Sequence, residues 1–194
     1  MGSFTDILAE VGGFDIPDRM QKFLHREQPP SQSEQTLSYY SYSYELAFRQ
    51  LAESVRERWR HNDLLKAPLF YLGRHSIELH LKYAIQEFSE YTGEQGTEKG
   101  HDLLALWNEL QRQQYDLADL PGRDDLWGKH VDKLIKHIHA IDPKGDSFRY
   151  PHNMSGKLFK YTRVEFEGLV KAHGNITGYC GASIHVLGEY RDAY

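Results

Sequence analysis

The sequence predicts an all-α fold, namely an antiparallel bundle of four to five main helices with a short N-terminal appendage. Two observations support this class. Apolar residues recur at steps of three and four over most of the chain, which is the period of an amphipathic helix. Breaks rich in Gly, Pro and Asp separate these segments. We therefore expect a peripheral N-terminal segment at 1–35 and a helical-bundle domain at 36–194.

The first half of the chain contains three predicted helical segments. A short amphipathic helix is predicted at 17–27, followed by a linker at 29–33 that begins with two prolines. The segment 36–61 is helical by its apolar spacing, which involves Leu37, Tyr40, Tyr44, Ala47, Phe48, Leu51 and Val55. Residues 39–44 also alternate as a strand would, but no partner strand is obvious. Pro68 suits the first turn of the next helix, expected at 68–91.

The second half begins with a loop at 92–100. Asp102 is expected to cap a helix that runs to about residue 115. After the turn at Pro121-Gly122, Asp124 or Asp125 is expected to cap a helix that ends near Ile141. A turn at 142–146 and an irregular segment at 147–160 follow.

The last predicted helix covers 162–190 and is rich in glycine. Each glycine in a helix interior costs roughly 1 kcal/mol relative to Ala. Gly174, Gly178, Gly181 and His185 form one column, which suggests a surface that another helix approaches closely. The alternative is that this helix breaks near Gly174.

Composition excludes several classes of protein. The 194 residues carry a net charge of −5, so no global basic field attracts nucleic acid. The single cysteine, Cys180, excludes an internal disulfide and multi-cysteine metal sites. We find neither a secretory signal nor an apolar run of about 20 residues that would span a membrane. The expectation is a cytoplasmic protein with no metal and no cofactor.

The segment at 70–88 carries the most informative charged residues. Wound as a helix, it forms an apolar stripe with Arg74 on one edge and His80 on the other, about 120° apart. Glu78 lies four residues after Arg74, and Lys82 four after Glu78, so both pairs can form ion pairs along the helix. Two such helices across a two-fold axis could bring Arg74 and His80 into one cleft.

Three stretches resemble the HEPN superfamily, small helical bundles that are common in prokaryotic toxin–antitoxin and phage-defence systems. The first has the family's motif of an Arg, a polar residue and a later His, here Arg74, His75 and His80. The other two are Gly100-His101-Asp102-Leu103-Leu104 and Phe148-Arg149-Tyr150-Pro151, in the same order as in one defence-associated branch. The resemblance covers roughly residues 36–190.

The resemblance implies a metal-independent endoribonuclease in which the RNA 2′-hydroxyl attacks the adjacent phosphate. His80 would act as general acid or base, Arg74 would hold the phosphate, and His75 would orient the other two or contact RNA. The resemblance also implies a homodimer, RNA as substrate, and an antitoxin or defence-system protein as partner.

A structural interpretation stands beside the catalytic one. Arg74, Glu78 and Lys82 could form an ion-pair ladder, with His80 half-buried at an interface. In that case the chain would be a non-catalytic helical module that binds RNA, a nucleotide or a partner protein.

Further binding candidates lie outside the 70–88 segment. Arg149 and His152 could bind phosphate or line a cleft, or Arg149 could anchor its loop on a carboxylate such as Glu78. His130, Lys133 and His137 share a helical face that could contact RNA phosphates, or could simply be solvated.

Overall fold

The computed structural model describes residues 32–57, 63–94, 96, 100–117, 125–153, 155–160, 163 and 165–193. Most of the predicted appendage, including the helix at 17–27, lies outside the described residues. Within the appendage, residues of the predicted linker and those after it form the 3-10 helix η1 (Gln32–Gln35). A second 3-10 turn, η3 (Asp63–Leu65), directly precedes the second of the main helices.

The all-α prediction is confirmed, because the described residues form five α-helices and no strand. These helices are α2 (Leu37–Glu57), α3 (Lys66–Thr92), α4 (Leu103–Tyr115), α5 (Leu126–Ile141) and α6 (Phe166–Ala193). Residues 39–44 belong to α2, so the alternating pattern there does not form a strand. α6 continues through Gly174 without the break that its glycines made conceivable.

The predicted helix caps form through ordinary local chemistry. Asp102 accepts hydrogen bonds from the backbone N–H groups of Leu104 and Ala105 at the start of α4. Asp125 caps α5 by accepting from Gly128 N, whereas the turn at 121–122 and the alternative cap at 124 lie outside the described residues. Gly93 ends α3 with a φ of 72°, a left-handed conformation that favours glycine.

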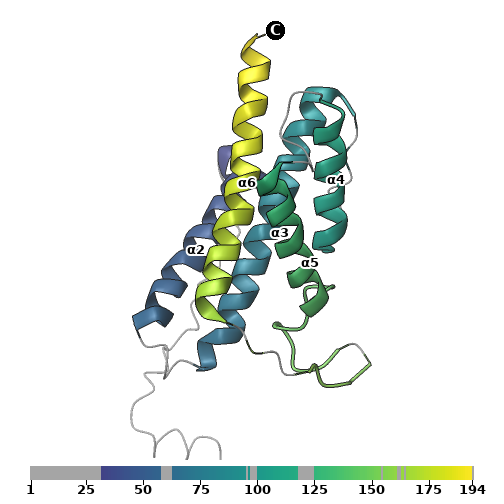
Figure 1. Cartoon of the computed structure of the whole chain (residues 1–194). Coiled ribbons are helices and arrows are strands. Elements are labelled where there is room, and N and C mark those ends of the chain that lie inside the picture. Colours follow the sequence, from purple (N-terminus) through teal and green to yellow (C-terminus); the bar gives the residue numbers. More distant parts are fainter. Residues whose placement is uncertain are drawn as a thin grey trace, which may run out of the picture. The chain divides into compact units, whose positions relative to one another are not determined.

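α3 is the central element and packs against α2, α4 and α6 (Figure 1). α2 and α5 run in the opposite direction to α3. α4 and α6 run in the same direction as α3. Residues further along α3 contact residues further along each of these two helices. His101, directly before the cap of α4, contacts Glu78 of α3.

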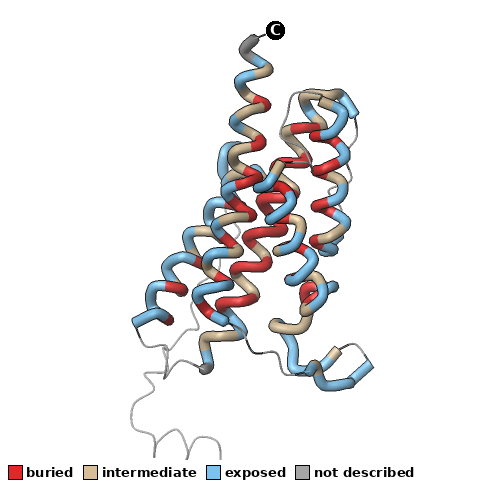
Figure 2. The backbone as a smooth tube through the Cα atoms, in the orientation of Figure 1, coloured by how far each residue is buried: buried red, intermediate tan, exposed pale blue. Residues whose placement is uncertain are grey.

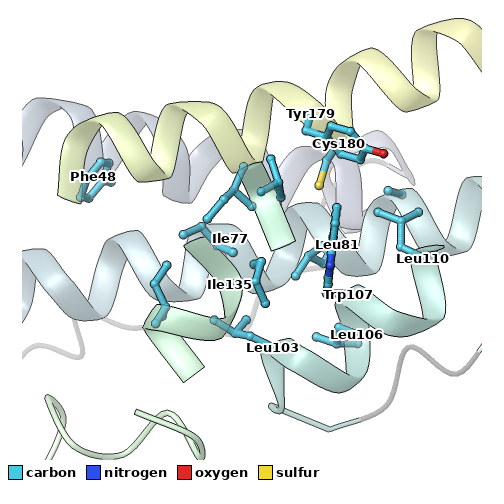
Figure 3. Close-up of a cluster of buried hydrophobic side chains, with 14 of the residues drawn as sticks. Phe48, Ile77, Leu81, Leu103, Leu106, Trp107, Leu110, Ile135, Tyr179 and Cys180 are labelled. Atoms are coloured by element: carbon cyan, nitrogen blue, oxygen red, sulfur yellow. The ribbon is translucent and has the colours of Figure 1, made fainter. Parts of the chain in front are cut away.

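The hydrophobic core lies along α3 and between α4, α5 and α6 (Figure 2). Its largest fully buried side chains include Trp107, Tyr179 and Phe48, which come from three different helices (Figure 3). The Trp107 indole N–H donates to Asp132 Oδ1 at 3.1 Å, so the one polar atom of this ring is paired. This core surrounds α3 closely, so 13 of its 27 residues are buried, and they include Arg74, Glu78 and His80.

Candidate functional site

Arg74 lies in the interior of the bundle and is only 4% exposed. Its guanidinium contacts two carboxylates. Nη1 is 3.2 Å from Glu78 Oε2, one turn along α3, and Nε is 3.3 Å from Asp142 Oδ2, directly after α5. A buried cation between two buried anions is electrostatically satisfied, whereas any one of the three alone would be costly.

The same guanidinium also holds two backbone segments. Nη2 donates to the carbonyl of His101 at 2.6 Å, and Nε lies 3.4 Å from the carbonyl of Asp142. Gly145 packs so closely that a Cβ there would lie 2.6 Å from Nη1 of Arg74. Arg74 therefore ties the segment before α4 and the turn after α5 to α3.

Glu78 is the second centre of this network, which we call the Arg74 cluster (Arg74, Glu78, Lys82, His101 and Asp142). Its Oε1 lies 3.0 Å from Lys82 Nζ and 2.9 Å from His101 Nδ1. Both ion pairs predicted along the helix are thus present. Burial alone would raise the pKa of the Glu78 carboxyl. The hydrogen bonds from His101 and Lys82 lower it by more, so the pKa of Glu78 lies below its usual value.

Asp142 connects this cluster to the next loop. Its Oδ1 accepts hydrogen bonds from the backbone N–H groups of Asp146 and Ser147, both at 3.1 Å. Phe148 then stacks on Phe70 of α3, with ring centroids 3.8 Å apart. The loop that carries Arg149 is therefore fastened to α3 on both sides of the turn.

His80 occupies a different environment, which faces α2. Its Nδ1 donates to the carbonyl of Ser76 at 2.9 Å, and its Nε2 lies 3.2 Å from Glu45 Oε2. The Tyr42 ring covers it edge-on at 5.6 Å. Burial lowers the pKa of His80, while the Ser76 carbonyl and the Glu45 carboxylate oppose that effect.

A second buried histidine adjoins this environment from α6. His173 Nε2 lies 3.0 Å from Ser76 Oγ, and the ring packs against Phe48 with centroids 4.1 Å apart. Burial lowers the pKa of His173 to about 3, with His80 and Arg49 adding to the effect. His173 is therefore neutral at physiological pH and belongs to the core.

Within one chain, the structure does not bring Arg74 and His80 together at a solvent-accessible cleft. Among the described residues they have no contact partner in common, and each is 4% exposed. The guanidinium of Arg74 is already occupied by two carboxylates and two carbonyl oxygens. The residues predicted to act as a pair therefore occupy two separate buried networks on different sides of α3.

The third residue of the motif, His75, is half-buried on α3 among aromatic rings. Tyr44 of α2 meets it edge-on at 4.5 Å, and Tyr71 lies parallel to it within 7° at 5.7 Å. Burial is the main influence on His75 and lowers its pKa. Lys82, Arg74 and His101 lower that pKa further and Glu78 raises it, so the charges of the Arg74 cluster act on His75.

Arg149 extends this row of rings. Its guanidinium carbon lies 5.4 Å from the ring centroids of both Tyr71 and Tyr150. No carboxylate pairs with it in the described part of the chain, so the predicted anchoring of Arg149 on Glu78 is not observed. We call the surface formed by Tyr71, His75, Lys82, His101, Arg149 and Tyr150 the His75 face.

His152 lies beside this face in the irregular segment. It is exposed and forms an isolated antiparallel bridge with Leu158. Together with Asp146, Tyr150, Pro151 and Asn153 it lines a shallow hollow in the loop surface. The hollow thus contains one carboxylate and one imidazole and borders the Tyr150 end of the His75 face.

Sequence reasoning missed four residues that define these surroundings: Asp142, Glu45, Tyr71 and His101. Asp142 has the sequence context of a turn, and its contact with Arg74 spans 68 residues, so no local pattern reveals it. Glu45 has the context of an ordinary polar residue of α2. His101 lies within the Gly100–Leu104 stretch, and its position just before a helix cap was the only local signal.

Among the described residues, no group of three or more His, Cys, Asp or Glu side chains could hold a metal ion. None of the described helices combines the length and the apolar character that crossing a membrane requires. The chain matches no protein-family model, and comparison with curated proteins and with solved structures gives no match either.

Proposed function

We propose that this chain is a non-catalytic helical module that binds single-stranded RNA on the His75 face. The observation that carries the proposal is Arg149. It is an exposed guanidinium between two tyrosine rings, with no carboxylate partner among the described residues. Unpaired bases stack on aromatic rings and on guanidinium planes, and the cation attracts the phosphate.

The charges around Arg149 support an anionic ligand. Lys82 and His101 lie on the same face, and His101 is 65% exposed in its side chain. Within the Arg74 cluster, Glu78 is only 2% exposed and already pairs with Arg74, Lys82 and His101, and Asp142 is buried against Arg74. The Glu78 carboxylate is thus covered, and Asp146, which lines the hollow beside Tyr150, is the carboxylate that borders the face.

The Arg74 cluster supports a structural role for the motif arginine within this module. A catalytic arginine must reach a phosphate, whereas Arg74 is saturated by partners of its own chain. The resemblance of residues 74–82, 100–104 and 148–151 to HEPN proteins agrees with an RNA ligand. On this basis we assign the module to a toxin–antitoxin or antiviral-defence setting.

A binding titration tests the proposal. Fluorescence anisotropy of a labelled oligouridylate of eight nucleotides would be measured in EDTA with wild type and with Arg149→Ala. Removal of one stacking surface is worth about 1–3 kcal/mol, so we expect affinity to fall about fivefold or more. Arg112→Ala is the matched control, because Arg112 is exposed at the far end of α4 and pairs with Glu94, Glu109 and Asp116.

Two outcomes would contradict the proposal. One is a wild type that does not bind the oligonucleotide, and the other is equal weakening by Arg149→Ala and Arg112→Ala. The same samples on a denaturing gel test cleavage. Fragments that form in EDTA with wild type and vanish with His80→Ala would contradict the non-catalytic proposal and support a metal-independent endoribonuclease.

The proposal also includes the homodimer that the resemblance implies. Light scattering coupled to size-exclusion chromatography should give twice the mass of one chain. A monomer at all concentrations would remove the dimer from the proposal and leave the RNA-binding face in place, since that face is formed within one chain.

A further inference from the structure

The loop after α5 contains a hollow that shares one side chain with the His75 face. The hollow is lined by Asp146, Tyr150, Pro151, His152 and Asn153. Its volume of about 460 Å³ lies within the range of about 300–1,000 Å³ that is usual for small-ligand sites. Tyr150 belongs to both surfaces, and its ring centroid lies 5.4 Å from the guanidinium carbon of Arg149. A ligand on the His75 face can therefore extend directly into the hollow.

Asp146 contributes a carboxylate to this hollow. Its backbone N–H donates to Asp142 Oδ1 at 3.1 Å, and its carbonyl accepts from the N–H groups of Arg149 and Tyr150 at 3.1 and 3.2 Å. Its side chain, in contrast, forms no ion pair or hydrogen bond with any residue that the structure describes. A carboxylate beside a surface that binds RNA repels the phosphates, unless the ligand also offers it hydrogen-bond donors.

Asn153 contributes an amide whose orientation is fixed. Its Oδ1 accepts from the backbone N–H and the hydroxyl of Ser155 at 3.0 and 2.7 Å, and from the N–H of Lys157 at 2.9 Å. These three bonds identify the oxygen, so Nδ2 is the remaining donor of the side chain. Nδ2 has no partner among the described residues. The hollow thus combines an acceptor carboxylate with a donor amide.

Backbone hydrogen bonds hold the lining of the hollow in place. Asn153 N donates to the carbonyl of Lys157 at 2.9 Å, and Phe159 N donates to the carbonyl of Pro151 at 3.3 Å. On the other side, the Asp146 carbonyl is bonded to the N–H of Tyr150. A lining that is fixed before the ligand arrives lowers the cost of ordering on binding.

Guanine is the base whose hydrogen-bonding groups match this lining. Its Watson–Crick edge has two adjacent donors, N1–H and the 2-amino group, next to the O6 acceptor. The two oxygens of a carboxylate can accept such a pair side by side. Adenine and cytosine each offer one amino donor next to an acceptor nitrogen, and uracil offers one N–H between two carbonyls. Only guanine therefore satisfies both oxygens of a carboxylate.

We infer that the hollow binds a guanine base of single-stranded RNA. Asp146 accepts from N1–H and the 2-amino group, and Asn153 Nδ2 donates to O6. The base lies against the exposed ring of Tyr150, and the neighbouring phosphate faces Arg149. The inference rests on the proposed function and narrows its ligand from any single-stranded RNA to RNA that contains guanine.

Four octanucleotides test this preference by fluorescence anisotropy. They are octauridylate and the same strand with one central guanosine, inosine or adenosine. We expect wild type to bind the guanosine strand about fivefold or more tightly than the adenosine strand. Adenosine controls for the stronger stacking of a purine. Inosine keeps N1–H and O6 but lacks the 2-amino group, so its affinity should lie between the two.

Asp146→Asn should remove the preference for guanosine, because an amide has one acceptor oxygen and its amino group would face a donor of the base. The backbone hydrogen bonds of residue 146 do not depend on this change. Affinity for octauridylate should not fall, since a negative charge is lost. Asp116→Asn is the matched control, because Asp116 lies at the end of α4 and pairs with Arg112. It should retain the preference.

The inference is overturned if wild type binds the guanosine and adenosine strands equally. It is also overturned if Asp146→Asn keeps the preference and changes the affinity for all four strands by the same factor, since Asp146 would then act through its charge alone. In both cases binding that depends on Arg149 would remain, and the proposed function would stand. Failure of wild type to bind any of the four strands would instead remove the proposed function itself.

Discussion

Arg74 and Arg149 are the two arginines that the sequence singles out, and the structure gives them opposite surroundings. Arg74 is 4% exposed and is bound by Glu78, Asp142 and two carbonyl groups. Arg149 is exposed, and its guanidinium lies against the rings of Tyr71 and Tyr150. The Arg74 guanidinium is fully paired within its own chain, whereas the Arg149 guanidinium is accessible to a ligand.

A residue of the motif can therefore support ligand binding without touching the ligand. Arg74 fixes the carbonyl of His101 and the turn from Asp142 to Ser147, and these two segments lead into the His75 face. We regard Arg74 as a positioning residue and Arg149 as a contact residue. The two roles predict separate changes in stability and in binding.

Arg74→Ala should destabilise the chain more than any other change considered for these two regions. The substitution leaves the buried carboxylates of Glu78 and Asp142 without their cation, which costs about 3–5 kcal/mol of unfolding free energy. Urea unfolding followed by circular dichroism measures it. Arg49→Ala is the control, since its side chain is 71% exposed and 3.9 Å from Glu45, and should change stability by less than about 0.5 kcal/mol. A decrease below about 1 kcal/mol for Arg74→Ala would refute its positioning role.

Burial of His173 predicts that the unfolding free energy depends on pH. Its pKa of about 3 in the folded chain lies below the value of about 6.5 expected after unfolding. The unfolded chain therefore binds more protons between these values, and stability falls as pH drops from 6.5 towards 3. The expected slope is about 1.4 kcal/mol per pH unit. His173→Gln cannot titrate, so its stability should depend less on pH in this window. Parallel curves for variant and wild type would contradict the assignment.

Two glycines test the packing of the Arg74 cluster through a smaller change in stability. Gly145 and Gly156 both have a φ of 77°, so Ala at either position costs about 1–2 kcal/mol of backbone strain. Only at Gly145 would the new Cβ also meet Arg74, whereas nothing lies within 4 Å at Gly156. We expect Gly145→Ala to destabilise more than Gly156→Ala in thermal unfolding. Equal shifts in Tm would mean that the turn can move away from the guanidinium.

A modest increase in stability is expected at an exposed glycine of α6. Nothing lies within 4 Å of a Cβ built at Gly174, so Ala would relieve the cost of glycine in a helix. Gly174→Ala should therefore raise the unfolding free energy by about 0.5–1 kcal/mol. Gly73→Ala is the opposite case, because its Cβ would lie 2.8 Å from the Phe48 ring, and it should be destabilising. A decrease at Gly174 in the isolated monomer would refute this explanation.

Much of the fold follows from local patterns. The periodicity of apolar residues predicts all five helices, and the aspartates at 102 and 125 cap two of them as expected. The pairing of Glu78 with Arg74 and with Lys82 follows from their spacing of four residues. These features depend only on neighbours along one helix.

The candidate site depends on how separate elements meet. The partners of Arg74 outside α3 are 27 and 68 residues away in the sequence. Each reaches Arg74 through a loop conformation that the spacing of apolar residues does not predict. Glu45 reaches His80 because of the rotation of α2 against α3. The stacking of Arg149 on Tyr71 depends on an irregular segment, so spacing could nominate Arg149 but could not identify its neighbours.

Photo-crosslinking tests most directly whether Arg149 is the residue that contacts RNA. An oligouridylate carrying 4-thiouridine would be irradiated with the wild-type chain, and crosslinked peptides would be mapped by mass spectrometry. We expect crosslinks in peptides that contain Tyr71 or Tyr150, and their disappearance in Arg149→Ala. Crosslinks confined to peptides outside the His75 face, or unchanged by Arg149→Ala, would contradict the assignment of Arg149 as the contact residue.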